Sequence, residues 1–308
     1  MHRLVLSVDL DEWYHSRRWV DGRQAHGVVD NRELFQRLYG ADRPAGEIIP
    51  PARALLDLFR RHGVRATFFV LGEIAQYYPD LVREIAGEGH EIASHGLIHV
   101  DMRVLGPDRF EQNLAESADL LERLAGARPV GYRAPNLVYE SWATAILERQ
   151  GFLYDASVCP SRSIGGKYKG WLRAPTVPYH PSYGNIAERG DAALVELPLP
   201  VFPGLRVAAG SSIITRIIGF HWTRIALLSA LRQGDTSYYV HPWEFGARPR
   251  VDGHWLRNRI FLRRMGPWLL RRMDRLLTAH RSRIVTAGEA ARRLAAAPAL
   301  AGRATSSS

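Results

Sequence analysis

Two histidines and two aspartates are spaced so that they can hold a metal ion and move protons. His95 and His99 stand four residues apart, just after a short apolar strand pattern, so both imidazoles can project on one side of the following turn. Asp9 and Asp11 close the first apolar run, and strand alternation turns both side chains to one face. Two imidazoles and one carboxylate make a divalent-metal site with open positions, which leaves the second carboxylate free to act as a base. Spacing alone also allows the plain alternative of cap and surface residues.

The elements that must position these side chains alternate between strands and helices. Apolar strand patterns lie at residues 4–8, 66–71, 90–94, 130–133, 152–155, 194–197, 237–240 and 283–285. Helical patterns lie at 50–62, 74–86, 107–124, 141–150, 215–231, 256–280 and 287–294, with long loops at 13–46 and 160–181. Such alternation predicts a parallel α/β architecture, and chemistry-bearing residues at the ends of several strands favour a barrel.

Five segments, in this order along the chain, resemble the polysaccharide deacetylases of carbohydrate esterase family 4, which share the NodB homology domain. The resemblance runs from Leu4 to about Leu294 and implies a deformed (β/α) barrel, with residues 1–294 as a single domain and 295–308 as a disordered tail. The five segments are Ser7–Trp13, Thr67–Gly72 with Gly89–His99, Gly131–Asn136, Tyr154–Val158 and Tyr239–Glu244.

The resemblance also implies a role for each matching residue. Asp11, His95 and His99 would bind a divalent metal, zinc by expectation, with Co²⁺, Ni²⁺ or Mn²⁺ as alternatives. Asp9 would be the general base and His241 the general acid, while Arg133 would hold the Asp9 carboxylate and keep it ionised. On the substrate side, Trp243 would wall the acetyl pocket, Asn136 would lie near the sugar, and Asp155 falls in the segment that orients the acid.

The chain departs from the family pattern at its first motif. Relatives commonly carry two adjacent aspartates, whereas here Leu10 separates Asp9 from Asp11 and Glu12 follows. Alternation favours Asp11 as the ligand, but Glu12 stays an alternative. Asn136 stands where many relatives carry an aromatic residue. The variant form looks most like a cytoplasmic subgroup associated with exopolysaccharide or lipid-linked glycan assembly.

These residues favour a metal-dependent hydrolase, and the resemblance implies that it removes N-acetyl groups from an N-acetylhexosamine glycan or a lipid-linked sugar. Hydrolysis of an amide needs activated water, a stabilised oxyanion and a proton for the departing nitrogen, and the predicted site supplies all three without a nucleophilic Ser or Cys. One alternative is a deformylase of a formamido sugar, or another small-amide hydrolase on the same fold. The other is a non-catalytic basic protein that binds a membrane surface.

Composition excludes several classes and places the excess charge. An apolar content of 46% excludes a disordered chain, and the single cysteine excludes a disulfide scaffold. The net charge is +10, yet residues 248–283 hold eleven arginines against two acids, so nearly all of the excess lies there. The segment 256–280 reads as a solvated basic helix or as a peripheral contact with anionic lipid; no binding module accompanies the charge, so nucleic acid is not expected.

The first residues and the apolar runs bear on where the protein works. The opening Met-His-Arg leads straight into Leu4–Val8, which is too short for a secretion signal, and no apolar run approaches the roughly 20 residues that a membrane span needs. We therefore expect a cytoplasmic protein, with the inner face of the membrane as its peripheral site.

Overall fold

A parallel sheet rolled into a half-barrel organises the chain. The computed structural model describes residues 1–16, 30–162, 171–202, 204–249 and 255–296, so most of the tail 295–308 lies outside the described residues. The strands of the sheet are β1 (Leu4–Leu10), β2 (Thr67–Val70), β3 (Glu91–Ser94), β4 (Gly131–Tyr132), β5 (Tyr154–Asp155), β6 (Val195–Glu196), β9 (Thr236–Val240) and β10 (Ile284–Val285). Their parallel pairing confirms the α/β class predicted from the alternation.

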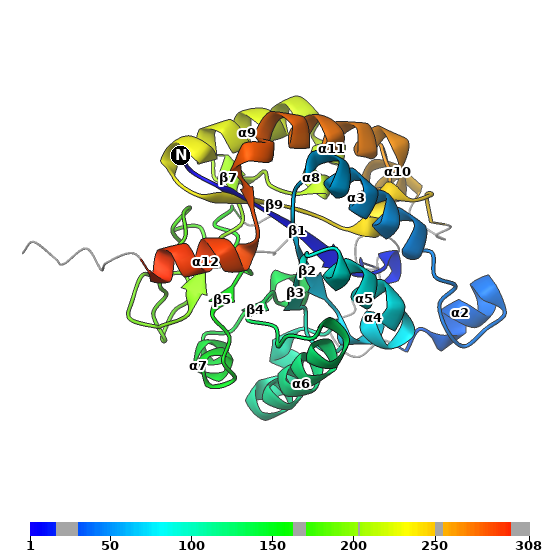
Figure 1. The fold of residues 1–308 in the computed structure, drawn as a ribbon, viewed down its shortest axis with the longest axis horizontal. Helices are drawn as coiled ribbons and strands as arrows, with labels where there is room; N and C mark the ends of the chain where they lie inside the picture. The colour runs from blue at the N-terminus through cyan, green and yellow to red at the C-terminus, as the bar shows by residue number, and fades with distance from the viewer. Residues whose placement is uncertain (17–29, 163–170, 203, 250–254, 297–308) are drawn as a thin grey trace, which may run out of the picture.

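The strand order leaves β1 at the centre of the site. Along the sheet the order is β9-β1-β2-β3-β4-β5-β6, and β10 pairs with the start of β1 at Leu4 and Val5. Figure 1 shows β1 and β9 side by side, with the green strands β4 and β5 farther round the roll. Because all strands run the same way, their carboxyl ends meet at one rim of the half-barrel.

Alternating residues of β1 serve two different cores. Leu4, Leu6, Val8 and Leu10 pack outward into a large apolar cluster shared with the surrounding helices. The intervening residues face the interior of the roll: Val5 belongs to a separate interior cluster, and farther along the strand lie Ser7 and Asp9. This period-2 alternation delivers polar groups to the interior while the outer face stays apolar.

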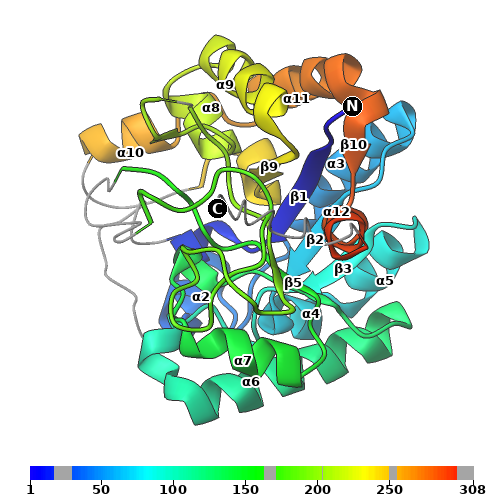
Figure 2. The same ribbon diagram turned by 90° about the vertical axis from the view of Figure 1, so that its left-hand side faces the viewer.

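The interior is closed at the amino ends of the strands by the C-terminal helix. The helix α12 (Ala287–Ala295) contacts β1, β5 and β6, and its Ala287, Ala290 and Ala291 pack with Val5 and Phe69. Its first turn is fixed by a capping box between Thr286 and Glu289. Figure 2 shows α12 (red) against this end of the roll. With that end filled, the site can open only at the opposite rim.

Helices cover the outside of the roll. In Figure 1, α3, α9 and α11 lie on the side of β1 and β9, while α6 and α7 lie by β4 and β5. Within the described residues no helix is long and apolar enough to cross a membrane. The helices are α2 (Arg32–Tyr39), α3 (Ile49–His62), α4 (Gly72–Tyr77), α5 (Pro79–Gly87), α6 (Met102–Ala125), α7 (Trp142–Arg149), α8 (Ser212–Ile217), α9 (Phe220–Gln233), α10 (Trp255–Phe261), α11 (Pro267–His280) and α12.

Three helices expected from periodicity are broken in two. The segment 74–86 divides at Pro79, which cannot donate a helical hydrogen bond. The segment 215–231 divides at Gly219, whose φ of 136° no helix accepts. The basic segment 256–280 divides between α10 and α11, because Arg264 and Gly266 both take left-handed φ values. The expected single basic helix is therefore two helices that meet at a turn.

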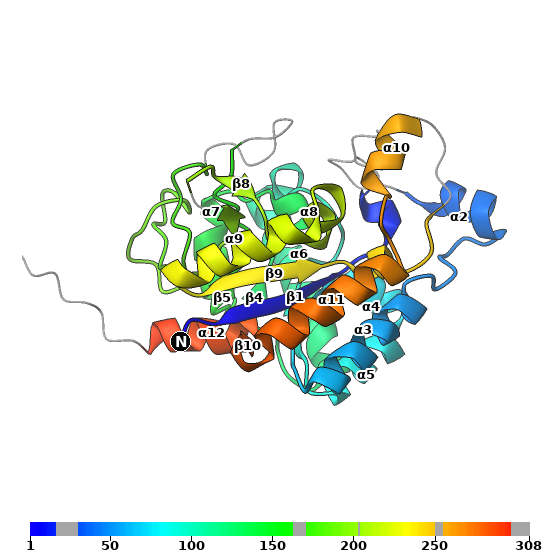
Figure 3. The same ribbon diagram turned by 90° about the horizontal axis from the view of Figure 1, so that it is seen from above.

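The first expected loop holds a helix, and the sequence reading missed a hairpin. Helix α2 lies inside the predicted loop 13–46, of which residues 17–29 lie outside the described residues. A two-stranded antiparallel pair, β7 (Val201–Phe202) and β8 (Val207–Ala208), follows β6. Figure 3 shows α2 and α10 beyond the same end of β1, at the rim where the carboxyl ends of the strands lie.

Candidate metal and catalytic site

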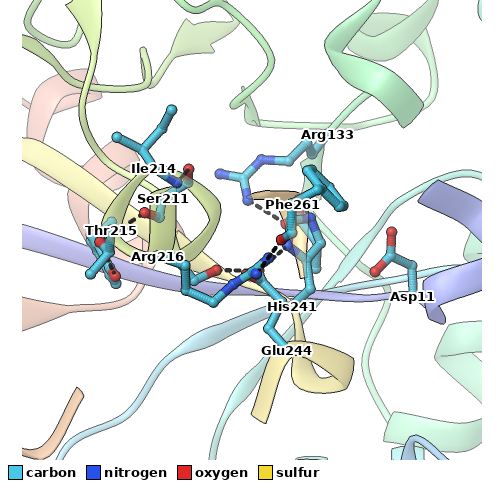
Figure 4. A network of polar contacts seen from close by, with 12 residues as sticks. Asp11, Arg133, Ser211, Ile214, Thr215, Arg216, His241, Glu244 and Phe261 are labelled. Carbon is cyan, nitrogen blue, oxygen red and sulfur yellow. Dashed lines mark hydrogen bonds and ion pairs between the residues drawn. The ribbon is translucent and has the colours of Figure 1, made fainter. Parts of the chain in front are cut away.

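A small pocket of about 50 Å³ opens at the carboxyl ends of β1, β3 and β9. Among its lining residues are both aspartates, both histidines of the spaced pair and His241. They come from three separate segments of the chain, and the parallel register brings them to one rim. Figure 4 shows Asp11, Arg133 and His241 around this point. The predicted chemistry-bearing residues therefore meet in one place.

Asp11, His95 and His99 form a set that fits a divalent metal. One ligand atom from each lies within 4.8 Å of the others. The Nδ1 of His95 lies 2.7 Å from the carbonyl oxygen of Arg133, and a carbonyl can only accept, so Nδ1 carries the proton and Nε2 is left with its lone pair. The Oδ1 of Asp11 is buried without a hydrogen-bond partner in the described structure. The donor set of two imidazoles and one carboxylate is typical of zinc.

The pKa directions in this set agree with metal binding. Burial lowers the pKa of His95 to about 4, which keeps the imidazole neutral, as a ligand must be. Burial raises the pKa of Asp11 to about 6, against the opposing pull of His241 and His15. A divalent cation would offset that desolvation, so these residues fit the group that the sequence implies.

Asp9 is held by Arg133 within the interior of the roll. The Nη1 of Arg133 donates to Asp9 Oδ1 at 2.5 Å and to Ser7 Oγ at 3.0 Å, and its Nε donates to the carbonyl of Ala156. The guanidinium carbon lies 4.0 Å from the centroid of the Phe69 ring. Burial alone would raise the pKa of Asp9, but Arg133, His95 and His241 together lower it. Asp9 is therefore an ionised, fixed proton acceptor.

His241 is oriented by Glu244, which sequence reasoning missed. His241 Nδ1 lies 2.7 Å from Glu244 Oε1, and the Nε of Arg216 donates to Glu244 Oε2 at 2.5 Å. Ser212 also donates to Glu244, and the Nη1 of Arg216 donates to the carbonyl of Phe261. Figure 4 shows this chain of contacts from helix α8 to His241.

The network sets the charges of its members. Burial favours neutral His241, but the carboxylates of Asp11, Glu244 and Asp9 outweigh it and raise its pKa to about 9. Burial opposes ionisation of Glu244 as well, yet Arg216 and His241 lower its pKa to about 2. His241 is thus an imidazolium whose Nε2 lies 3.9 Å from Asp9 Oδ2.

Asp155 does not orient His241, which corrects the sequence-based assignment. Its two carboxylate oxygens accept from the backbone N–H and the hydroxyl of Ser157. The Ser157 hydroxyl oxygen in turn accepts from the backbone N–H of Ala134, next to Arg133. Asp155 therefore supports the loop that carries Arg133. Glu244, three residues after His241 on a 3₁₀ turn, takes the expected place of Asp155.

Asn136 lines the small pocket, and Trp243 does not. Asn136 has a φ of 58°, and its Nδ2 donates to Asp101 Oδ1 at 3.0 Å. Trp243 lies behind His241, with ring centroids 5.9 Å apart, and faces a second, larger pocket. The expectation that Trp243 walls the acetyl pocket is therefore corrected: the apolar lining comes from Ala134, Leu137, Ile213 and Tyr239.

Glu12 is separate from the metal set. The group of ligand atoms that could hold an ion includes Asp11 and leaves Glu12 out, so the geometry favours Asp11 over Glu12. Burial and repulsion from Glu47 raise the pKa of Glu12 to about 8.

Comparison with known proteins gives matches over two adjoining parts of the chain. Residues 50–154 match the family described as polysaccharide deacetylase, and residues 156–287 match a domain of unknown function, DUF3473. A peptidoglycan-N-acetylglucosamine deacetylase of Bacillus cereus is 37% identical over 94 residues, 30% of this chain and 33% of that protein. The peptidoglycan deacetylase-like protein FGM2 of Gibberella zeae is 38% identical over 158 residues, 51% of this chain and 44% of that protein.

The overall fold is also similar to a solved structure. A putative polysaccharide deacetylase from Mycobacterium smegmatis superposes with a TM-score of 0.63 at 21% identity, covering 95% of this chain and 91% of that one. The matches to the two curated relatives span less than half of each relative's own length.

Proposed function

Because the chain belongs to the polysaccharide deacetylase family, we propose that it is a metal-dependent hydrolase that removes N-acetyl groups from an N-acetylhexosamine glycan. The observation that carries the proposal is the convergence of a metal-ligand set, an ionised carboxylate and an imidazolium on one pocket. An amide hydrolase needs these three kinds of group together.

The metal-ligand residues are Asp11, His95 and His99. A divalent ion held there would supply Lewis-acid chemistry, lowering the pKa of water and polarising the amide carbonyl. Zinc is the ion we propose, because the set offers two nitrogens and one oxygen. The hydrogen bond from His95 to the Arg133 carbonyl fixes the imidazole before any ion arrives.

Two side chains move protons in this proposal. Asp9 accepts the proton of the attacking water, and its ion pair with Arg133 keeps it ionised and aimed at the pocket. His241 donates a proton from Nε2 to the departing nitrogen, while Glu244 accepts the hydrogen bond from Nδ1. The acid and the base stand on the same pocket, so both can reach one scissile amide.

The walls of the pocket suit a small acyl group. Leu137, Ile213 and Tyr239 surround the catalytic groups with apolar surface that a methyl group can contact. The pocket volume of about 50 Å³ admits an acetyl group and leaves the sugar outside. Asn136, at the edge of the pocket, is the residue we assign to the sugar.

We also propose how far the catalytic domain extends along the chain and where in the cell it works. We treat residues 1–294 as one domain, a view supported by β1, which pairs with β2 of the first matched region and with β9 and β10 of the second. We place the enzyme in the cytoplasm, with α10 and α11 against the anionic inner face of the membrane. Support comes from the exposed Leu256 and Ile260 next to the arginines of these helices.

The test is product release with the metal controlled. Purified protein is stripped, reloaded with zinc or cobalt, and given N-acetylated chitooligosaccharides and lipid-linked amino sugars, and both acetate and formate are measured. We expect the wild type and the surface control Glu33→Gln to release acetate, and Asp9→Asn to release none. Formate as the product would favour the deformylase alternative, and a loaded protein that releases neither would favour a non-catalytic role.

A further inference from the structure

A larger pocket, of about 680 Å³, lies beside the metal pocket and is not used by the chemistry described above. Two short connections join it to the site: Glu12 follows the metal ligand Asp11, and Trp243 lies two residues after His241. Its volume falls within the range of pockets that bind small organic molecules. Its walls come from the segment after β1, from α2 and α3, and from the turn after β9.

Two carboxyl groups line this pocket, Glu12 and Glu47, and neither takes part in an ion pair among the described residues. Glu47 accepts hydrogen bonds from Trp13 Nε1 at 3.0 Å and from the Tyr39 hydroxyl at 2.8 Å, both at Oε2. Glu12 is 1% exposed, and no side chain of the described residues lies within hydrogen-bond distance of its carboxyl oxygens. A buried carboxyl without a side-chain partner is costly, so a ligand that supplies donors would be favoured there.

Aromatic rings make up much of the remaining wall. Trp13, Tyr39, Trp243 and Phe245 all line the pocket. Rings of this kind attract organic cations through their faces and pack against the apolar faces of sugar rings. A carboxylate such as Glu47, set among aromatic rings, suits an ammonium group rather than an anion.

We propose that this pocket binds the primary ammonium group of an amino sugar, a residue of the glycan that has already lost its acetyl group. The proposal rests on the proposed function and extends it to the substrate that the enzyme prefers. An ammonium has three donors and one positive charge, which suit the exposed carboxyl of Glu47 and the buried carboxyl of Glu12 close to it. An N-acetylated residue offers no charge to these carboxyls, so a partly deacetylated chain is bound better than a fully acetylated one.

The net positive charge of the chain disfavours cation binding elsewhere on the protein, so a cation would bind only where carboxyl groups gather, as they do in this pocket. At +10 the protein as a whole repels cations, and Arg248 stands at the edge of this pocket. Only a local group of carboxyls can therefore hold an ammonium. The nearness of the pocket to His241 favours a saccharide amine over a free polyamine, because a glycan can occupy both pockets at once.

The experiment measures binding without turnover. Metal-stripped protein is titrated calorimetrically with glucosamine tetramer, with N-acetylglucosamine tetramer, and with spermidine. Wild type is compared with Glu47→Gln, whose exposed side chain makes the change tolerable, with Glu12→Gln, and with Glu33→Gln as the matched control on α2. We expect Glu47→Gln to weaken binding of the glucosamine tetramer by about threefold to tenfold, and Glu12→Gln to weaken it by about tenfold or more. Glu33→Gln should bind the glucosamine tetramer as the wild type does, and no variant should change the affinity for the acetylated tetramer.

Each other result counts against the proposal. Unchanged affinity of Glu47→Gln for the glucosamine tetramer overturns it. An equal loss for the acetylated tetramer means that the pocket recognises hydroxyl groups, and equally tight spermidine means an unspecific cation site. Because no acetate is measured, a failure here leaves the proposed deacetylation standing, and a failure of acetate release leaves this binding result readable by itself.

Discussion

Replacing Glu244 by Gln should move the alkaline limit of turnover to lower pH. In the wild type the pKa of His241 is about 9 against an ordinary 6.5, because the carboxylates around it outweigh its burial. That difference corresponds to about 3 kcal/mol in favour of the protonated imidazole. The sign follows: a raised folded pKa contributes stability that is complete below pH 6.5 and is lost as the pH rises through 9.

The variant keeps a hydrogen-bond acceptor for Nδ1 and removes one of the charges. Loss of an opposite charge at this range typically shifts a pKa by about 1–3 units, so we expect the pKa of His241 to fall to about 7.5. At pH 9 about half of the wild-type imidazole is protonated, against about 3% in the variant, so kcat/KM at that pH should fall by about 15-fold more than at pH 6.

The assay is a pH profile of acetate release, with circular dichroism on each sample. The variant leaves the buried Arg216 without its carboxylate and should lose about 3–5 kcal/mol of stability, so folding must be checked at every pH. Ser212→Ala is the control, since it removes one hydrogen bond to Glu244 without changing the charge. An unchanged alkaline limit in Glu244→Gln, with an equal loss of rate at every pH, would refute the reasoning.

Three further outcomes are expected. His95→Ala should abolish stoichiometric metal, measured by mass spectrometry, while Asp9→Asn should keep the metal and lose at least about 100-fold in kcat; a wild-type rate for Asp9→Asn contradicts its role as base. Arg133→Met should lower the free energy of unfolding in urea by about 3–5 kcal/mol, because Asp9 stays buried and unpaired; adding Asp9→Asn should recover part of that loss. Liposomes with anionic lipid should bind the wild type in low salt only. Binding should be lost in a variant in which Arg263, Arg264, Arg271 and Arg272 are neutralised, and binding that survives in that variant would count against membrane contact.

The sequence was sufficient to predict that the site residues lie at the carboxyl ends of strands. Apolar runs of five or six residues followed by polar side chains predict buried parallel strands, and the shared direction of the strands brings their ends together. Asp9, Asp11, His95 and His241 could therefore be placed at one rim without coordinates.

The contacts by which Arg216 and Glu244 orient His241 could not be predicted from the sequence, because they depend on the tertiary structure. Arg216 lies in α8, 28 residues before Glu244, and nothing in its local pattern distinguishes a fully buried arginine from a solvated one. Glu244 carried a signal in its spacing, three residues after His241 with a proline between them, which favours a tight turn. The break between α10 and α11 was readable from Gly266-Pro267, but apolar periodicity on both sides obscured it.

The pairing of β1 has a consequence for the order in which the protein is made. β1 leaves the ribosome before its two partners, and β9 and β10 follow more than 220 residues later. At a translation rate of about 5–20 residues per second, the edge of β1 that pairs with β9 stays unpaired for roughly 10–50 s. His95 and His99 emerge well before that, so a nascent chain can assemble the metal-ligand set early. The proposed proton donor, His241, emerges 142 residues after His99, so a nascent chain that already held an ion would still lack the group that protonates the leaving nitrogen.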